Sequence, residues 1–190
     1  MSTCTEKAPE HRDMFRWKTL CSAITIAMLV AVEGNIGSGK TSLLNELERR
    51  GFRVLREPVE NWRFMIPRYE NPYRWAFTFQ VEAILSMAAL MESAPKDELV
   101  FVERSVATAL LFSRIAFREG FISENELALL RALALRVNVL PDASVCIDAT
   151  KDECSQRIRE RNREGEVVSM KYLEKIEKAH RKELNCMFVG

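Results

Sequence analysis

The chain has 190 residues, of which 47% are apolar and 29% are charged, as is ordinary for one soluble domain with a hydrophobic core. Its formal net charge is +1. That balance provides no overall field to attract a nucleic acid polymer or an anionic membrane, so we expect neither as a partner.

The cysteines favour a reducing compartment, and the first residues favour a loosely ordered leader over a targeting segment. No C-x-x-C pair occurs, so we expect reduced thiols rather than zinc or disulfides at Cys4, Cys21, Cys146, Cys154 and Cys186. Residues 1–19 mix acidic and basic side chains, unlike secretory or mitochondrial targeting segments. We therefore predict a loosely ordered leader over 1–19, one domain over 20–190, and a cytoplasmic rather than mitochondrial location.

Apolar runs alternate with helical periodicities along the chain. The run Leu20–Val32 is too short for a membrane span and leads into a glycine motif, so we interpret it as ending in a buried strand. Strands are predicted at Ala27–Val32, Arg53–Leu55, Leu99–Val102 and Ala143–Ile147. Helices are predicted at Thr41–Arg50, Pro72–Met91, Ser105–Phe117, Glu124–Val137, Lys151–Asn162 and Met170–Leu184. This alternation predicts an α/β fold, a parallel sheet flanked by helices.

The clearest motif is the segment Gly34–Thr41, GNIGSGKT. It fits G-x-x-x-x-G-K-[ST] and lies between a predicted strand and a predicted helix, the context of a phosphate-binding P-loop. Its glycines let backbone N–H groups turn toward phosphate oxygens, and the helix adds the positive end of its dipole. We expect Lys40 to neutralise the β- and γ-phosphates of ATP and Thr41 to bind Mg²⁺.

Acidic residues follow two of the predicted strands, where ligands of parallel sheets bind. Glu57 comes after the second strand, and Glu103 and Arg104 come after the third. A carboxylate can accept the proton of a sugar hydroxyl, which makes Glu57 the candidate base. Glu103 is a candidate metal ligand, and Arg104 suits a carboxylate or a phosphate. Taken alone, Glu57 also fits a solvated turn, and Glu103 with Arg104 also fits a structural ion pair.

An aromatic run and an arginine run complete the motifs. Trp62, Tyr69 and Phe79 precede Gln80, whose amide can bond the edge of a nucleobase, whereas Trp75 and Phe77 are expected in the core. Four arginines occur at alternate positions, Arg157, Arg159, Arg161 and Arg163. Taken alone, this segment also fits a solvated helix surface balanced by acidic residues. We interpret it as a helix end and loop that close over phosphates.

Together these motifs resemble the deoxynucleoside kinase family. The resemblance runs from about Val30 to Leu184. It rests on EGNIGSGKT at 33–41, EPVENW at 57–62, Tyr69, Trp75-Ala76 and Phe79-Gln80, ERS at 103–105, and the arginine segment followed by YLE at 172–174. It implies a P-loop kinase fold with an arginine-rich lid and transfer of phosphate from ATP to the 5′-hydroxyl of a deoxynucleoside.

The resemblance also implies roles for individual residues. Catalysis is expected from Glu57, Arg104, Lys40, Arg161 and Arg163. ATP contacts are expected from Gly34, Asn35, Ile36, Gly37, Ser38, Gly39, Lys40, Thr41, Ser42, Arg157 and Arg161. Deoxynucleoside contacts are expected from Glu57, Trp62, Tyr69, Phe79, Gln80, Met87, Arg104, Ala109 and Glu166. Mg²⁺ is expected at Thr41 and Glu103.

The base preference follows from two positions of the resemblance. Deoxycytidine and deoxyguanosine kinases carry an arginine and an aspartate where this chain has Met87 and Ala109. The residues here match the thymidine-accepting and multisubstrate members, and Ala109 leaves space for a 5-methyl group. We therefore expect a thymidine or pyrimidine preference, with Ala83 leaving room for purines.

Three departures from the family pattern bear on the expectation. No carboxylate occurs near Leu135–Arg136, where a family glutamate for the 3′-hydroxyl is expected. Gly165 replaces an acidic lid residue, which is expected to loosen the lid. Cys186–Val189 is too short to supply both a fifth strand and an adenine-contacting loop.

Two other functions fit parts of the sequence. A nucleoside monophosphate kinase would share the P-loop and the arginines, but its acceptor would need a cation where Glu57 stands. A non-catalytic nucleotide-binding protein fits only the departures. The family also implies a homodimer that packs helices near Pro72–Met91 and Ser105–Phe117.

Overall fold

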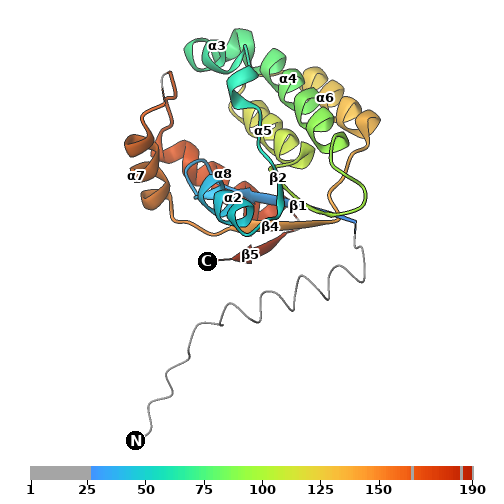
Figure 1. The fold of residues 1–190 in the computed structure, drawn as a ribbon. Coiled ribbons are helices and arrows are strands. Elements are labelled where there is room, and N and C mark those ends of the chain that lie inside the picture. Colours follow the sequence, from blue (N-terminus) through green and yellow to red (C-terminus); the bar gives the residue numbers. More distant parts are fainter. Residues whose placement is uncertain (1–26, 164, 185, 190) are drawn as a thin grey trace, which may run out of the picture.

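A single parallel sheet forms the centre of the molecule. The structure is a computed structural model that describes residues 27–163, 165–184 and 186–189 (Figure 1). The strands lie in the order β2-β3-β1-β4-β5, and every pairing is parallel. Their bounds are β1 (Met28–Gly34), β2 (Arg53–Leu55), β3 (Leu99–Glu103), β4 (Ala143–Ile147) and β5 (Met187–Val189). The predicted α/β fold with a parallel sheet is confirmed.

The central strand β1 explains where ligands can bind. Ala31 and Val32 are almost completely buried, as expected for a strand covered on both faces. Val32 pairs with Glu103 of β3, and Gly34 pairs with Ile147 of β4. The phosphate-loop motif therefore begins at the carboxyl edge of the sheet, beside the end of β3.

Helices cover the sheet and continue beyond it. They are α2 (Lys40–Arg49), α3 (Met65–Glu70), α4 (Pro72–Glu92), α5 (Val106–Arg118), α6 (Glu124–Val137), α7 (Lys151–Arg161) and α8 (Met170–Glu183). Figure 1 shows α4, α5 and α6 as one group above the sheet, with α3 at its end and α7 on the other side of the molecule. All the predicted helices are present, and no end is shifted by more than one residue.

Short-range signals account for the helix ends. Ser123 and Thr150 begin α6 and α7 with reciprocal capping boxes to Glu126 and Glu153, which satisfy backbone N–H groups of the first turn. Gly51 follows α2 with φ +85°, as expected for a glycine that ends a helix. The short helix α3 was not predicted.

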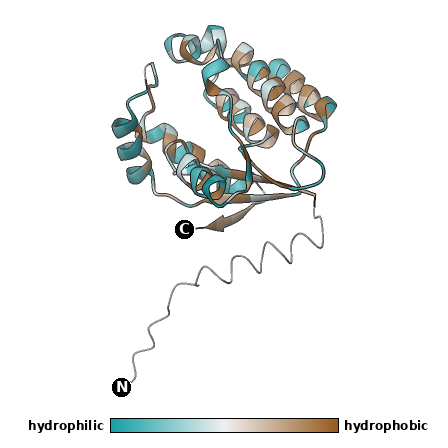
Figure 2. Cartoon of the chain, in the orientation of Figure 1, coloured by the Kyte–Doolittle hydropathy of each residue, from teal (hydrophilic) through white to brown (hydrophobic). Residues whose placement is uncertain are grey.

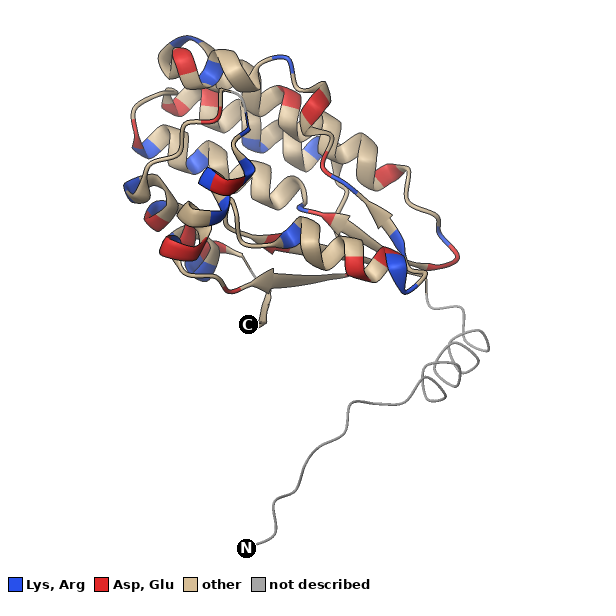
Figure 3. Ribbon diagram, turned by 60° about the vertical axis from the view of Figure 1, so that its left-hand side comes forward, with Lys and Arg blue, Asp and Glu red and all other residues tan. Residues whose placement is uncertain are grey.

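The main core lies between α4, α5, α6 and the sheet. Its members include the fully buried Ile84, Met87, Met91 and Leu130. Figure 2 shows apolar colour along the strands and mostly hydrophilic colour on α7. Figure 3 shows acidic and basic residues interspersed over the ribbon, in keeping with the near-zero net charge. None of the described helices is long and apolar enough to span a bilayer.

The structure bears on the predictions for the C-terminal segment and three of the cysteines, but not on the predicted leader. The predicted leader over 1–19 lies outside the described residues, as do Cys4 and Cys21. Cys146, Cys154 and Cys186 are free cysteines within the described residues. Met187–Val189 forms the fifth strand, with Cys146 paired to Phe188, so this short segment is sufficient for a parallel edge strand.

Candidate active site

A cavity of about 600 Å³ opens at the carboxyl ends of β1, β2 and β3. Its volume lies in the usual range for a site that holds one small molecule. Most of the residues predicted for the site line it: Ile36, Gly37, Gly39, Lys40, Thr41, Ser42, Glu57, Trp62, Tyr69, Phe79, Gln80, Met87, Glu103, Arg104, Ala109, Arg157, Arg161, Arg163 and Glu166. One cavity thus collects segments that are far apart in the sequence.

The phosphate loop has a backbone conformation that requires glycine. Gly37 has φ +78°, and a Cβ there would lie 2.6 Å from the backbone oxygen of Cys154. Gly34, Asn35 and Ser38 do not line the cavity. Instead, the Asn35 amide donates to the Leu173 carbonyl over 2.9 Å and ties the loop to α8. The loop is therefore held between the sheet and the two last helices.

Lys40 is buried within this loop, with 5% of its surface exposed. Its ammonium donates to the carbonyl oxygens of Asn35 at 2.7 Å and Gly34 at 3.2 Å. Burial, together with the charge of Arg104, lowers its pKa to about 7. An anionic ligand in the loop would favour the charged form of Lys40, because opposite charges stabilise each other strongly where water is excluded.

Glu57 and Arg104 form a buried ion pair on the cavity wall. Arg104 Nη1 donates to Glu57 Oε2 over 2.7 Å, and the two side chains are 7% and 11% exposed respectively. Arg104 has φ +64°, a left-handed conformation that is uncommon for residues other than glycine. Its N–H donates to the Val32 carbonyl over 3.0 Å, which fixes this strained residue to the end of β1.

Glu33 lies beneath the turn from Arg104 into α5, and the sequence analysis gave it no role. It is 1% exposed and accepts hydrogen bonds from Ser105 Oγ at 2.6 Å and from Thr108 Oγ1. Burial raises the pKa of its carboxyl group. The available signal was one acidic residue inside the otherwise apolar strand β1. Glu33 fastens the first turn of α5 and, through it, the neighbouring Arg104.

Thr41 and Glu103 face each other at the phosphate end. The Thr41 hydroxyl donates to Glu103 Oε1 over 3.4 Å, so two oxygen groups converge beside the loop. Within the described ranges, no cluster of three or more His, Cys, Asp or Glu side chains could hold a metal. Magnesium in phosphoryl-transfer sites needs only one or two protein oxygens, because phosphates and water complete its shell. The pair fits that need.

Aromatic and apolar side chains form the other end of the cavity. The rings of Trp62 and Phe79 meet edge to face at 5.5 Å, and Trp62 Nε1 donates to Ser86 Oγ over 2.7 Å. Gln80 is 1% exposed, and its Oε1 accepts a 3.3 Å hydrogen bond from Ser113. This end therefore combines aromatic ring surface with the polar amide of Gln80.

The buried residues of that end match the predictions in part. Met87 and Ala109 are buried and line the cavity. Trp75 does not line it and stacks on Phe64 with centroids 5.4 Å apart, while Phe77 packs against the main core. The predicted core position of Phe77 is confirmed, whereas Trp75 is half-buried and belongs to none of the core clusters among the described residues.

Arg68 is a cavity residue that the sequence analysis missed. It lies on α3 beside Tyr69, whose pKa is raised by burial. Its guanidinium carbon is 4.3 Å from the Tyr69 ring centroid and 5.0 Å from that of Phe79. Because α3 is short and contains Pro67, no helical periodicity indicated that Arg68 would face the site.

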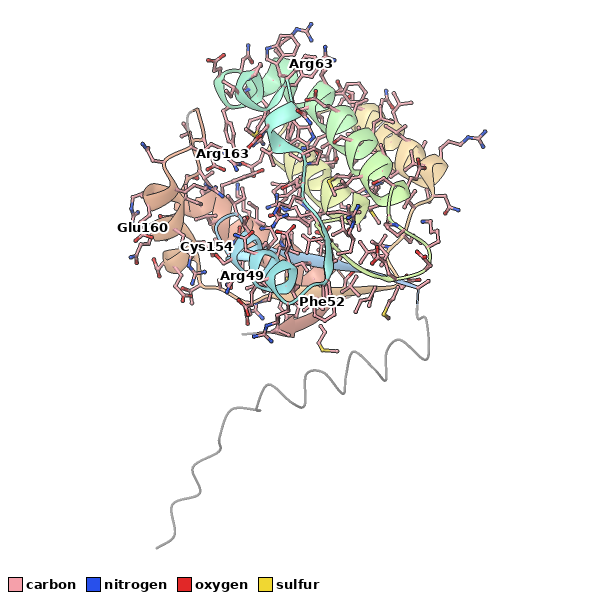
Figure 4. All side chains as sticks on the ribbon, viewed as in Figure 1. Arg49, Phe52, Arg63, Cys154, Glu160 and Arg163 are labelled. Atoms are coloured by element: carbon pink, nitrogen blue, oxygen red, sulfur yellow. The ribbon has the colours of Figure 1, made fainter. Side chains whose placement is uncertain are left out.

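The arginine segment divides between a helix end and a loop. Arg157 Nη1 donates to the Ser38 carbonyl over 3.0 Å, and Arg161 pairs with Glu166 at 2.6 Å. Figure 4 shows Arg163 on the inner side of this region, toward α3, and Glu160 on the outer side of α7. The alternating arginines thus separate, and Arg159 instead bonds Ser155 on α7.

The structure shows where two of the three departures from the family pattern lie. Leu135 and Arg136 are exposed on α6 and do not line the cavity, so the lack of a carboxylate there has no bearing on a sugar bound in it. Gly165 has φ +70°, and a Cβ there would lie 3.2 to 3.4 Å from Ile66 of α3. Glycine therefore lets the lid loop approach α3 closely, while the expected loosening of the lid stays a prediction.

A phosphate loop, an acid–arginine pair and an arginine lid around one cavity define the class of nucleotide-dependent kinases. The family model for deoxynucleoside kinases matches residues 30–187, and the chain belongs to the deoxynucleoside kinase family. It is therefore an ATP-dependent kinase that phosphorylates deoxynucleosides.

Relatives from viruses and animals agree with this assignment. The chain is 32% identical over 143 residues to a protein of Frog virus 3 named provisionally as a deoxynucleoside kinase, covering 74% of this chain and 73% of that protein. It is 28% identical over 176 residues to a Fowlpox virus protein named provisionally as a deoxycytidine kinase, covering 87% and 75%. It is 30% identical over 165 residues to mitochondrial thymidine kinase 2 of Homo sapiens, covering 80% and 62%.

Proposed function

We propose that this kinase phosphorylates the 5′-hydroxyl of pyrimidine deoxynucleosides, with thymidine preferred, and that Glu57 accepts the hydroxyl proton. The observation that carries the proposal is the buried 2.7 Å pair of Glu57 and Arg104 between the phosphate loop and the aromatic end. Arg104 fixes Oε2 and so orients the carboxylate. A carboxylate held in this way can serve as a general base without moving at the moment of transfer.

The phosphate end supports the ATP half of the reaction. Backbone N–H groups of the phosphate loop, Lys40 and the lid arginines Arg157, Arg161 and Arg163 are the groups that would hold the ATP phosphates. Thr41 and Glu103 would hold Mg²⁺, which neutralises charge on the β- and γ-phosphate oxygens when it is bound. Lys40 would exchange its hydrogen bonds with Asn35 and Gly34 for phosphate oxygens.

The aromatic end supports the nucleoside half. Trp62 and Phe79 offer ring surfaces for a base, and the Gln80 amide can both donate to and accept from the base edge. Ala109 has the small side chain that a 5-methyl group needs beside it. Tyr69 and Glu166 would then lie along the sugar. These contacts favour thymidine over bases that lack the methyl group.

The test is phosphate transfer from ATP–Mg²⁺ to thymidine, deoxycytidine, deoxyadenosine, deoxyguanosine and thymidine monophosphate. Glu57→Gln keeps the size of the side chain but removes the base, so we expect turnover of thymidine to fall by about 10²- to 10⁴-fold. The matched control is Glu70→Gln, an exposed residue of α3 that does not line the cavity, with turnover unchanged.

Other outcomes of the same assay would contradict the proposal in separate ways. Full activity of Glu57→Gln would remove Glu57 as the base. Preference for deoxyadenosine or deoxyguanosine would overturn the pyrimidine preference, and turnover of thymidine monophosphate alone would place the acceptor in another class.

The proposal includes a homodimer built on α4 and α5, as in the family. Leu85 of α4 is 47% exposed and Phe117 of α5 is 39% exposed, so both helices carry apolar surface that a second copy would cover. Sedimentation equilibrium gives the mass directly, and a monomer at micromolar concentration would contradict this part.

A further inference from the structure

Arg68 is a cavity cation that the proposed mechanism leaves unused. Its Nη1 donates to the Tyr172 hydroxyl over 3.5 Å, while its Nε is buried without a hydrogen-bond partner. Among the other cavity arginines, Arg104 is paired with Glu57 and Arg161 with Glu166. Within the described part of the chain, Arg68 has no such ion pair.

A buried guanidinium with an unused N–H is costly unless a ligand completes it. An unsatisfied buried donor destabilises the folded protein, and it does so more strongly when it is charged. The missing partner must be an acceptor, because a guanidinium only donates. Nε itself is enclosed by protein atoms, so a substrate in the cavity can meet Arg68 only at its terminal Nη groups, which likewise only donate.

The neighbours of Arg68 indicate which part of the substrate this is. Its guanidinium lies over Phe79 as well as Tyr69, and Phe79 precedes Gln80 on α4. Trp62 packs edge to face on the same Phe79 ring, and its own N–H is already bonded to Ser86. Arg68 and Gln80 therefore supply the side-chain donors around the ring surface that would receive the base.

We propose that Arg68 is a specificity-determining residue that donates a hydrogen bond to a carbonyl oxygen of the bound base. It selects an oxo group at that position and disfavours an amino group, which would place two donors against each other. The inference rests on the proposed function, because it assumes that the base lies at the aromatic end.

The test pairs one substitution with a set of thymidine analogues. Arg68→Met removes the donors and keeps an unbranched apolar side chain. Arg74→Met is the matched control, because Arg74 also lies over an aromatic ring, 4.5 Å from the centroid of Trp75, but is exposed and outside the cavity. The substrates are thymidine, 2-thiothymidine, 4-thiothymidine and 3′-deoxythymidine, since sulfur accepts hydrogen bonds more weakly than oxygen.

We expect Arg68→Met to lower kcat/KM for thymidine by about 10- to 100-fold, the loss that corresponds to one hydrogen bond from a charged donor. The loss must be several-fold smaller for one of the two thio analogues, because that analogue already lacks the bond. Arg74→Met should change all four substrates little. Arg68→Gln, which keeps an amide donor, should retain part of the thymidine activity.

Two results would overturn the inference. An equal loss for thymidine and both thio analogues would show that Arg68 does not contact the base. A reduced loss with 3′-deoxythymidine alone would assign the contact to the sugar. Substrate affinity from tryptophan fluorescence and the melting temperature separate a binding effect from misfolding, with Arg68→Gln as the second variant. Wild-type enzyme inactive on every nucleoside would instead sink the proposed function itself.

Discussion

The two ends of the cavity are built by different means. At the phosphate end, one continuous segment forms the loop proposed to hold ATP, and its shape depends on glycine backbone such as Gly37 at φ +78° and Gly39 at φ +102°. At the nucleoside end, side chains from α3, α4 and α5 meet, such as Tyr69, Gln80 and Ala109. A substitution at the first end should therefore remove activity, whereas one at the second should change which substrate is used.

Gly37→Ala should have the largest effect, because the new Cβ would strike the Cys154 carbonyl at the start of the lid helix α7. We expect ATP binding to fall by more than about tenfold, measured with a fluorescent ATP analogue. Gly120→Ala is the control, since Gly120 has φ +76° but nothing within 4 Å of the added Cβ. Both variants should lose about 1 to 2 kcal/mol of stability from backbone strain. Equal ATP binding by the two variants would contradict the clash.

His180 tests the support beneath the phosphate end. It lies on α8 and is 2% exposed. Burial is the main reason that its pKa is lowered from 6.5 to about 4. The positive charges of Arg104 and Lys40 add to this shift, and a hydrogen bond to the Ile176 carbonyl opposes it. The unfolded chain binds this proton more readily, so stability should fall as the pH drops from 6.5 to 4. The loss is about 3 kcal/mol by linkage.

The measurement for His180 is urea unfolding of the wild type and His180→Asn across this pH window. The substituted protein should lose that part of the acid sensitivity, whatever its stability at pH 7. Parallel stability curves for the two proteins would mean that His180 is not held neutral in the folded state.

Ala109→Val should have the smallest effect and act only on the nucleoside end. Two extra carbon atoms at this buried cavity residue would fill the space proposed for the 5-methyl group. We expect kcat/KM for thymidine to fall about tenfold more than that for deoxyuridine, with KM for ATP unchanged. The control is Ala88→Val, a buried alanine of α4 outside the cavity, which should leave the thymidine-to-deoxyuridine ratio as it is. A constant ratio in Ala109→Val would move the methyl group elsewhere.

The same contrast explains what could be predicted from the sequence. The phosphate loop could be predicted because its residues are contiguous in the sequence and its glycines indicate the backbone conformation directly. The strand ends that carry Glu57 and Glu103 followed from the alternation of elements. Arg68 and Glu33 could not be assigned, because their partners lie far along the chain, 104 residues away at Tyr172 and 72 residues away at Ser105.

Local conformation also concealed two features. Pro67 interrupts the pattern of α3, although a proline is tolerated in the first turn of a helix, where N–H groups have no partner. From the sequence, Gly165 was interpreted as the loss of an acidic lid residue. In the structure, its lack of a side chain allows close approach to Ile66. In both cases the deciding neighbour is a residue that sequence spacing does not identify.

Because Gly165 contacts Ile66, the short helix α3 both supports the lid loop and lines the cavity. The six residues of α3 carry Ile66, which receives the lid loop, and Arg68 and Tyr69, which face the cavity. A change that tilts α3 to admit a different nucleoside would also displace the surface on which the lid rests. We therefore expect substitutions that tilt α3 to change substrate range and turnover together.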